Sequence, residues 1–451
     1  MAQQTTPGFK RPRKQQRVVT SVIVQPLQAF MHTEVAGGVF LLIAAAVALV
    51  WANSPAHESY ERLWETPLSV TWGPFAIEEA LRDWVNDLLM AFFFFVVGLE
   101  IKRELVLGEL RDVRAATLPL VCALGGMIAP ASLYALLNTS GPATSGWGVP
   151  MATDIAFAVG VLALVGARAP ASLKVFLLTL AVADDLGAIA VIAIFYTRGL
   201  QVEWLAVAAA AVLVVLTLRR SGIRRYVWYV GVAGVLWLAI FESGVHATIA
   251  GVILGFLTPA RPLHPPEAVS GLAERHLERL QMAAPDGVAD EREQATLMEV
   301  SRLAREGVSP LARLEHALHS WTSFLILPLF ALANAGVRVA AGGFTSLLDE
   351  PVTIGIILGL VVGKPLGITI AAFITVKTGL GRLPRGVGWL EIVGVGLLGG
   401  VGFTVAIFIA GLAFEDTALT NAAKVGILLA SATAGIVGAA FLAARDAAKH
   451  S

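Results

Sequence analysis

The chain has 451 residues, of which 56% are hydrophobic and only 15% are charged, and its mean hydropathy is +0.74. Soluble domains carry roughly 25% charged residues, so this composition excludes an ordinary soluble protein and indicates one that is solvated by lipid. The formal net charge is zero at pH 7, which gives no reason to expect a nucleic-acid partner. With Cys122 as its single cysteine, the chain can form neither an intrachain disulfide nor a cysteine-based metal site, and we expect no cofactor.

The N-terminal segment is polar and basic. Residues 1–21 lack the apolar core and the small-residue cleavage site of a secretory signal. We therefore expect residues 1–33 to be a cytoplasmic tail. The simplest role for its basic residues is that of a solvated charge run.

Twelve apolar stretches follow, each close to the 20 or so residues that a helix needs to cross a bilayer. In lipid only helices and closed barrels satisfy the backbone, and these stretches lack the alternation of barrel strands. We therefore predict an all-α polytopic membrane protein with about twelve transmembrane helices, spans 1–8 within residues 34–260 and spans 9–12 within 320–444. The predicted spans are 34–53, 85–101, 116–137, 146–167, 173–196, 202–218, 226–241, 244–259, 320–337, 352–376, 388–414 and 423–444.

The distribution of basic residues predicts the orientation, because short cytoplasmic loops concentrate Lys and Arg. Basic clusters recur on alternate connections, whereas residues 58–83 are mostly acidic and residues 138–149 are uncharged. Both termini, including the tail 445–451, are therefore expected on the cytoplasmic side of the membrane. The basic residues that carry this prediction are Lys102, Arg103, Arg111, Arg114, Arg168, Lys174, Arg219, Arg220, Arg224, Arg225, Lys377, Arg382, Arg385, Arg445 and Lys449.

One long segment does not belong to the membrane. Residues 261–319 are rich in Pro, Glu and Arg, with leucines at helical spacing. We predict a cytoplasmic loop that contains two amphipathic helices joined through the turn at Pro285, Asp286 and Gly287.

Four ionisable residues lie in the middle of apolar spans: Asp154, Asp184, Asp185 and Lys364. Each costs about 2.5–3.5 kcal/mol on insertion scales, which makes it a functional candidate. A structural ion pair between helices is the alternative. That alternative explains one Asp and one Lys but leaves a second carboxylate over, because adjacent helical residues point about 100° apart.

This group of residues suits the exchange of a cation for protons. A carboxylate that is buried beside another carboxylate takes up a proton more readily than an exposed one. Hard cations prefer oxygen ligands. A site that holds either a proton or a cation, but not both together, performs antiport.

Two spans contain glycine and proline at a density that predicts broken helices. Gly146, Gly148 and Pro150 precede Asp154 in the fourth span, and glycines from Gly394 to Gly402 precede Thr404 in the eleventh. The two spans have opposite orientations and are the middle members of two trios, spans 3–5 and 10–12, which predicts inverted repeats with a binding site where the breaks meet. Asp154 and Lys364 would there offset the charges of the helix ends. Close packing of small residues is the alternative explanation for the glycines.

At several places the sequence resembles the NhaA-type sodium/proton antiporters. The resemblance covers residues 36–443 in order, and the paired breaks follow a rule for which this family is itself a standard example. The matching runs begin at Gly98 (GLEIKREL), Ala152 (ATDIAFA), Ala183 (ADDLGA), Ser243 (SGVHAT), Leu325 (LILPLFA), Gly363 (GKPLGI) and Gly402 (GFT).

The resemblance implies electrogenic exchange of sodium or lithium for more than one proton across a bacterial inner membrane, activated at alkaline pH. It implies that Asp185 is the main carrier, that Asp184 forms a salt bridge with Lys364, that Asp154 lies at the helix crossing, and that Thr153 is a secondary sodium ligand. The family often dimerises through a β-hairpin after the first span. Residues 68–77 are suited to such a hairpin.

The resemblance also implies roles outside the transport core. Asp87 resembles a carboxylate of the periplasmic pathway, whereas Glu100, Glu104, Glu315, His316 and His246 resemble pH-response positions. His246 is equally explained as a satisfied polar residue near the membrane surface, and Glu100 and Glu104 as a surface ion-pair group. Two departures affect this region: the loop of about 262–310 is longer than is usual, and Ala312 stands where a basic residue is common.

Two functions other than antiport could also use buried aspartates in a membrane protein. An intramembrane aspartyl protease would use Asp154 and Asp185 as a dyad, but the Gly-x-Gly-Asp motif is absent and a lysine at mid-membrane would suppress the shared proton. A sodium-coupled symporter of an organic anion on a related fold remains the alternative. The absence of further mid-membrane Arg argues for small inorganic ions.

Overall fold

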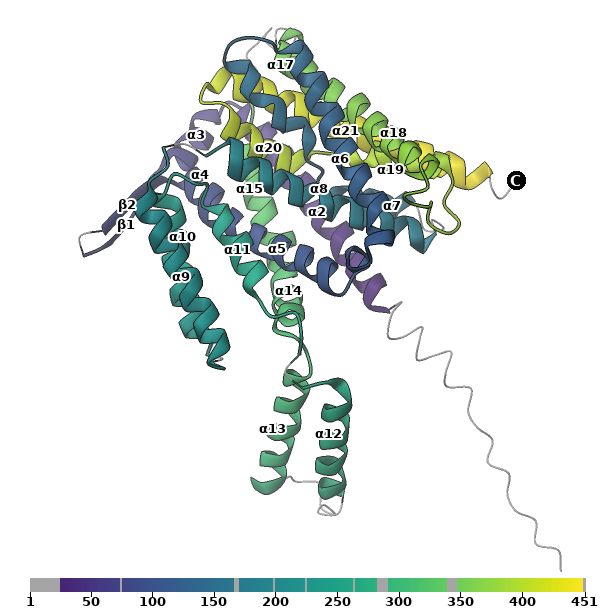
Figure 1. Cartoon of the computed structure of the whole chain (residues 1–451). Coiled ribbons are helices and arrows are strands. Elements are labelled where there is room, and N and C mark those ends of the chain that lie inside the picture. The colour runs from purple at the N-terminus through teal and green to yellow at the C-terminus, as the bar shows by residue number, and fades with distance from the viewer. Residues whose placement is uncertain are drawn as a thin grey trace, which may run out of the picture.

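The chain forms a bundle of helices from which a β-hairpin and a pair of helices project (Figure 1). The computed structural model describes residues 25–448 except 74, 166–169, 198, 224, 263, 282–290 and 339–346. The hairpin and the helix pair serve below to name the two ends of the bundle, the hairpin end and the α12–α13 end.

The predicted spans are present as helices. Eight helices are long and apolar enough to cross a membrane, two further pairs qualify together but are bent by 114° and 48°, and two apolar helices are shorter. Within the described residues these match the twelve predicted spans, so the helical polytopic fold is confirmed. The first eight spans are α2 (Gln25–Ala52), α4–η2–α5 (Leu81–Trp84, Val85–Leu89, Met90–Val106), α6 (Val113–Leu137), η4–α7 (Pro142–Met151, Ile155–Val165), α8 (Ala171–Phe195), α9 (Val202–Arg220), α10 (Tyr226–Glu242) and α11 (Thr248–Leu257).

The last four spans follow the α12–α13 pair. They are α14–η5–α15 (Pro310–Trp321, Thr322–Ile326, Leu327–Asn334), α17–η6–α18 (Pro351–Leu358, Gly359–Gly363, Lys364–Lys377), α19–α20 (Trp389–Gly399, Phe403–Ala413) and α21 (Thr417–Ala448). Spans two, nine and ten each contain a π-helical segment (η2, η5 and η6), in which the backbone hydrogen bond reaches one residue further than in an α-helix.

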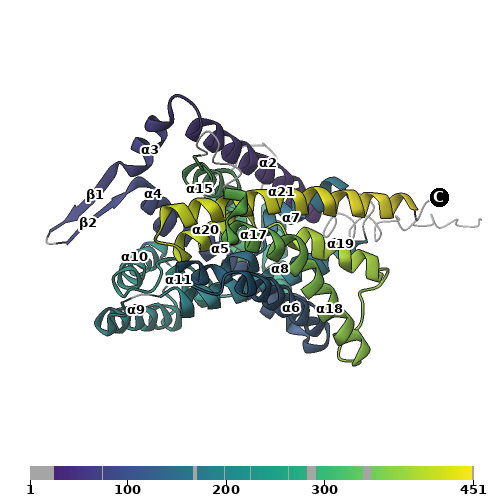
Figure 2. The same ribbon diagram turned by 90° about the horizontal axis from the view of Figure 1, so that it is seen from above.

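The hairpin end is formed by the segment after the first span. The helix α3 (His57–Glu65) turns sharply away from α2, and β1 (Pro67–Trp72) then pairs with β2 (Phe75–Ala80) in antiparallel register. Gly73, at φ +61°, supplies the left-handed backbone that a two-residue turn needs. Figure 2 shows the hairpin extending well beyond the bundle.

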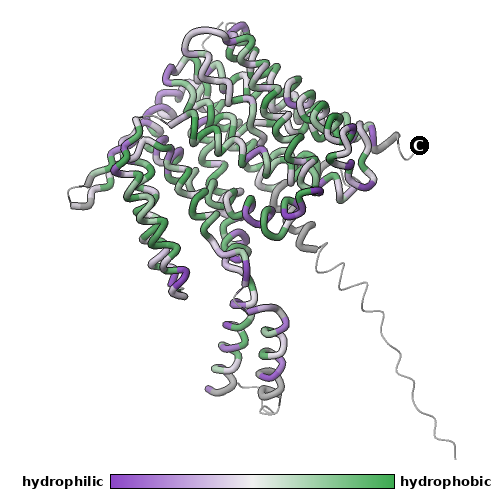
Figure 3. The backbone as a smooth tube through the Cα atoms, viewed as in Figure 1, coloured by the Kyte–Doolittle hydropathy of each residue, from purple (hydrophilic) through white to green (hydrophobic). Residues whose placement is uncertain are grey.

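The α12–α13 end carries the non-membrane segment. The helices α12 (Pro266–Gln281) and α13 (Glu291–Glu306) stand side by side outside the bundle, and they are far more hydrophilic than the spans (Figures 1 and 3). Leu303 of α13 is buried, and the Nε2 atom of His264 lies 3.3 Å from Oε2 of Glu306. The predicted turn at 285–287 lies outside the described residues.

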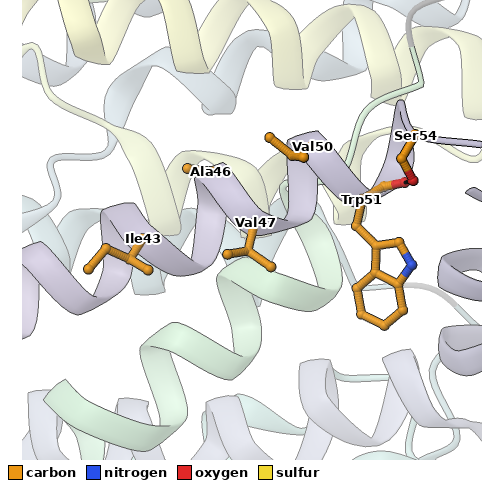
Figure 4. Close-up of a pocket in the computed structure, with 6 residues that line it drawn as sticks. All are labelled: Ile43, Ala46, Val47, Val50, Trp51 and Ser54. Atoms are coloured by element: carbon orange, nitrogen blue, oxygen red, sulfur yellow. Dashed lines mark hydrogen bonds between the residues drawn. The ribbon is translucent and has the colours of Figure 1, made fainter. Parts of the chain in front are cut away.

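The surface of the bundle is apolar along its sides, as a lipid-facing surface must be. Figure 4 shows a shallow hollow along α2 that is lined by Ile43, Ala46, Val47, Val50, Trp51 and Ser54. Ile43, Val47 and Val50 are 56%, 48% and 71% exposed. Because its lining holds no ionisable group, this hollow is a lipid-facing groove and not an ion site.

Candidate functional site

Two broken spans cross inside the bundle and are joined by backbone contacts. In span four the 3₁₀-helix η4 ends at Met151 and α7 begins at Ile155, and in span eleven α19 ends at Gly399 and α20 begins at Phe403. The amide of Asp154 donates to the carbonyl of Val401 at 2.7 Å, and the Thr153 hydroxyl donates to the carbonyl of Gly399 at 2.9 Å. The predicted breaks therefore lie against each other, and each satisfies backbone groups that the other leaves free.

Asp154 lies at the start of both half-helices that leave the crossing. Its carboxylate accepts from the amide of Phe157 at 3.0 Å, and from the amide and the hydroxyl of Thr404 at 3.1 and 2.6 Å. The side chain is 2% exposed. A negative charge at two helix N-termini offsets the positive ends of both helix dipoles, as the sequence predicted.

Lys364 provides the opposite charge. It is fully buried at the start of α18, and its ammonium donates to Asp184 Oδ2 at 2.5 Å and to the carbonyl of Met151, the last residue of η4. A cation therefore meets the carbonyl end of a half-helix. Gly126 and Gly399 flank the lysine stem, where a Cβ on either would come within 4.0 Å of it.

Asp184 and Asp185 differ in their partners, although both are buried in α8 at 1% and 5% exposure. Asp184 is paired with Lys364 through one oxygen, and its Oδ1 has no hydrogen-bond partner in the described part of the chain. Asp185 accepts no hydrogen bond from any residue that the structure describes. The charges that act on it are Asp184, Glu100 and Asp154, all of like sign, and Lys364. The site thus contains one carboxylate with a fixed cationic partner and one without.

Thr153 is fully buried in the crossing. Because its hydroxyl hydrogen is donated to Gly399, only the lone pairs of its oxygen remain for a cation. The structure brings Asp154, Asp184, Lys364 and Thr153 together through the segment 151–154, with Asp185 adjacent in α8.

At the hairpin end, Asp87 and His246 face each other. Their Oδ1 and Nε2 atoms are 3.5 Å apart, and the side chains are 22% and 13% exposed. The other ring nitrogen of His246 is 3.0 Å from the Thr248 hydroxyl, and the His246 ring meets Phe408 at a centroid distance of 5.0 Å. His246 thus contacts a hydroxyl and an aromatic ring close by. It also lies beside Asp87, a carboxylate to which the sequence analysis gave a separate role.

At the α12–α13 end, an arginine joins two of the predicted acids. Arg103 pairs with Glu315 through Nη1 and lies 3.7 Å from Glu104 through Nη2. Lys102 instead caps α11 by donating to the carbonyls of Phe256 and Thr258. Lys102 and Arg103, the two basic residues next to Glu104 in the sequence, therefore bind different partners.

The remaining two pH-response candidates are less closely tied to this cluster. Glu100 acts electrostatically on Asp185 in the crossing, and His316 acts on Glu315 and His319. A hollow of about 890 Å³ opens beside the cluster and is lined by acidic and basic side chains and by Thr179 of α8. One wall of this hollow is formed by Val175, Leu178 and Thr179 of α8, the helix that carries Asp184 and Asp185.

Sequence reasoning missed two partners. Thr404 directly follows the glycine-rich break, so a hydroxyl at a half-helix start was the available signal. Arg103 stands between Glu100 and Glu104, and its pairing with Glu315 could not be read from spacing. Cys122 is buried and free, and the described residues contain no group of three or more His, Cys, Asp or Glu side chains suited to a metal ion.

Comparison with known proteins addresses the identity of the chain. Residues 28–442 match the family model of the Na+/H+ antiporter 1 proteins. The Na(+)/H(+) antiporter NhaA 2 of Sorangium cellulosum is 49% identical over 92% of this chain and 89% of its own, and the NhaA of Oleidesulfovibrio alaskensis is 49% identical over 92% and 93%. The NhaA of a Janthinobacterium species is 44% identical over 98% and 97%.

Among solved structures, the sodium proton antiporter MjNhaP1 of Methanocaldococcus jannaschii superposes with a TM-score of 0.46 and 14% identity over 94% of each chain. That likeness is too weak to support an argument. The family model and the relatives cover nearly the whole chain, including both broken spans. The chain therefore belongs to the NhaA-type family of Na+/H+ antiporters, and it is a multi-pass membrane transporter and not an enzyme.

Proposed function

We propose that the chain exchanges intracellular sodium or lithium for external protons, electrogenically and with activation at alkaline pH, by alternating access to Asp185. The observation that carries this proposal is the unequal pair in α8: Asp184 is held by Lys364, whereas Asp185 has no hydrogen-bond partner among the described residues. A buried carboxylate without a fixed partner must bind a proton or a cation.

The number of titratable groups supports exchange of more than one proton for each sodium. Asp185 can bind a proton when sodium leaves, and the Asp184–Lys364 pair can bind a second one. The free Oδ1 of Asp184 and the lone pairs of Thr153 supply further oxygens for the cation. Two protons for one sodium ion would move net charge across the membrane.

Alternating access is supported by the crossing. The trios α6–α7–α8 and α18–α20–α21 each contain one broken span, and the two breaks meet at Asp154 and Thr404. If one trio moves as a unit against the neighbouring helices, the site is exposed to one side and then to the other. The hollow beside Glu104 would be the entrance from the α12–α13 end.

The basic loops support an orientation in which the α12–α13 end and both termini face the cytoplasm. In that orientation Asp87 and His246 lie on the periplasmic side of the pathway. The group of Arg103, Glu104 and Glu315 lies on the cytoplasmic side, with Glu100 and His316 nearby, and would provide the pH response. The projecting hairpin would pair with a second copy in a homodimer.

The test is sodium-induced collapse of a preformed pH gradient in everted vesicles or proteoliposomes, scanned from about pH 6.5 to about 9 to bracket the neutral range. We expect a sodium-dependent response in the native chain and none in Asp185→Asn, since an amide can neither exchange a proton nor offer a charge. Asp349→Asn is the matched control, because Asp349 is exposed at the hairpin end. A sodium response that persists in Asp185→Asn would refute the assignment of the carrier, and absence of any sodium response in the native chain would favour the symporter alternative.

A further inference from the structure

Two of the compound spans share a local pattern that the function has not explained. In each, a π-helical segment is followed by one residue and then by a proline. The residue before the proline donates its amide five positions back: Lys364 to Gly359 in span ten, and Leu327 to Thr322 in span nine. The prolines are Pro365 and Pro328.

Proline explains why the helix widens there. In an α-helix its ring collides with the carbonyl four residues back, Val361 for Pro365, and no amide is present to bond that carbonyl. An extra residue in the turn moves the carbonyl away from the ring. Proline thus favours the π segment in spans nine and ten, although it is not the sole cause of such turns: η2 forms without a proline, and α6 stays α-helical with Pro119 and Pro130 inside it.

The widened turn determines where Lys364 points. One residue added to a turn rotates everything after it by about 100° relative to the helix before it. The part before the turn, α17, is fixed by close packing, since a Cβ on Gly355 would lie 2.7 Å from the Asn138 side chain and 2.9 Å from the Tyr134 ring. With that part fixed, the turn sets the direction of the lysine towards Asp184 and Met151.

The turn also frees a carbonyl at the crossing. Because the Lys364 amide bonds to Gly359, it does not bond to Leu360, which would be its α-helical partner. The Leu360 carbonyl lies against Gly400, where an added Cβ would come within 2.4 Å of it. The π segment thus fits span ten to the break in span eleven.

We propose that Pro365 is a positioning residue for ion exchange: by holding span ten in a π turn, it aims the Lys364 ammonium at Asp184 and at the end of η4. This inference rests on the proposed function, in which the Asp184–Lys364 pair takes part in proton exchange. Pro365 itself touches no ion. It is buried against Gly396 of α19.

The first experiment compares Pro365→Ala with Pro328→Ala in proteoliposomes. Alanine lets the turn close to an α-helix, which rotates Lys364 away from Asp184. We expect Pro365→Ala to raise the KM for sodium about tenfold, because small misplacements in a site have effects of this size or larger. Its pH profile should move to more alkaline values, since a nearby ammonium favours ionised carboxylates. Pro328→Ala removes the same constraint from a span that carries no residue of the crossing, so its KM for sodium should stay within about twofold of the native value.

A rescue variant separates positioning from simple damage. Deleting Val362, which is 40% exposed on the lipid side of the turn, shortens the turn by one residue. In Pro365→Ala with Val362 deleted, the Lys364 amide meets Gly359 four positions back, as in a regular α-helix. The parts of span ten on either side of the turn then present the same residues to their neighbours as in the native protein. We therefore expect the sodium KM and the pH profile to return towards native values.

The outcomes distinguish the inference from the function on which it rests. Native kinetics in Pro365→Ala, or equal defects in Pro365→Ala and Pro328→Ala, would overturn the positioning role while Asp185→Asn still reports on the carrier. If Pro365→Ala fails to fold, the deletion variant decides: a folded and active double variant supports the inference, and a folded variant with altered KM and pH profile refutes it. A sodium response that persists in Asp185→Asn would refute the proposed function whatever Pro365 does.

Discussion

Two charged regions of this molecule differ in how their charges are balanced. In the crossing, Asp154, Asp184 and Lys364 are at most 2% exposed, and each meets a helix end or an opposite charge. In the cluster at the α12–α13 end, the side chains of Arg103, Glu104 and Glu315 are 32%, 11% and 11% exposed. Water reaches Arg103 and can replace part of a lost interaction in the cluster, but it cannot do so in the crossing.

The difference indicates which region can carry ions and which can tune the transport. Removal of one partner in a dry site leaves a charge that must be neutralised by a proton or a cation, which is the property that exchange requires. Removal of one partner in a partly exposed cluster shifts the populations of the protein's conformations only slightly, which suits regulation. Substitutions in the two regions should therefore differ in size and in kind.

Lys364→Met should have the largest effect. It leaves the buried Asp184 carboxylate unpaired, and loss of one partner of a buried pair costs about 3–5 kcal/mol. We expect a large fall in the thermal unfolding temperature of the purified protein, steeper at pH 9 than at pH 6 because a lone buried carboxylate must take up a proton, together with loss of sodium-dependent antiport.

The double variant Lys364→Met with Asp184→Leu is the control for this prediction. Replacing both members of a buried pair by apolar side chains is often neutral or stabilising, so thermal stability should recover while transport stays absent. A Lys364→Met protein as stable as the native one would contradict the contrast between the two regions.

The crossing was largely predictable because its signals are local. A charge in the middle of an apolar stretch, and a run of glycine and proline before it, can each be read without knowledge of the fold. Hydropathy likewise predicted the twelve spans. The start of α2 at Gln25, ahead of the predicted start at residue 34, could not be predicted, because the polar residues before 34 mask the helix in a hydropathy profile.

The contacts between distant residues were not predictable. The spacing of residues in the sequence does not show that Asp87 lies beside His246. Nor does it show that Arg103 pairs with Glu315 while Lys102 donates to a carbonyl at the end of α11. These choices depend on how helices far apart in the sequence pack together. The π segments escaped prediction for another reason: a proline inside a span predicts a disturbance but not its form.

Arg103→Gln should have an intermediate effect that is confined to regulation. The free energy of unfolding should change by about 1 kcal/mol or less, because partly exposed pairs are weak. The pH profile of antiport should shift, and the shift should shrink as salt is raised. Arg302→Gln, which removes an exposed ion pair with Glu299 in α13, is the control. A complete loss of transport in Arg103→Gln would place Arg103 in the transport machinery.

Arg62→Ala should have the smallest effect, although the distance within its ion pair is close to that of the pair in the crossing. Arg62 lies 2.7 Å from Glu58, one helical turn away in α3, compared with 2.5 Å between Lys364 and Asp184. The two side chains of the surface pair are 79% and 67% exposed, so water solvates either charge when its partner leaves. We expect unchanged thermal unfolding and unchanged sodium KM. Since the two distances are so similar, a measurable loss in Arg62→Ala would mean that geometry, and not exclusion of water, decides the strength of the pairs in this protein.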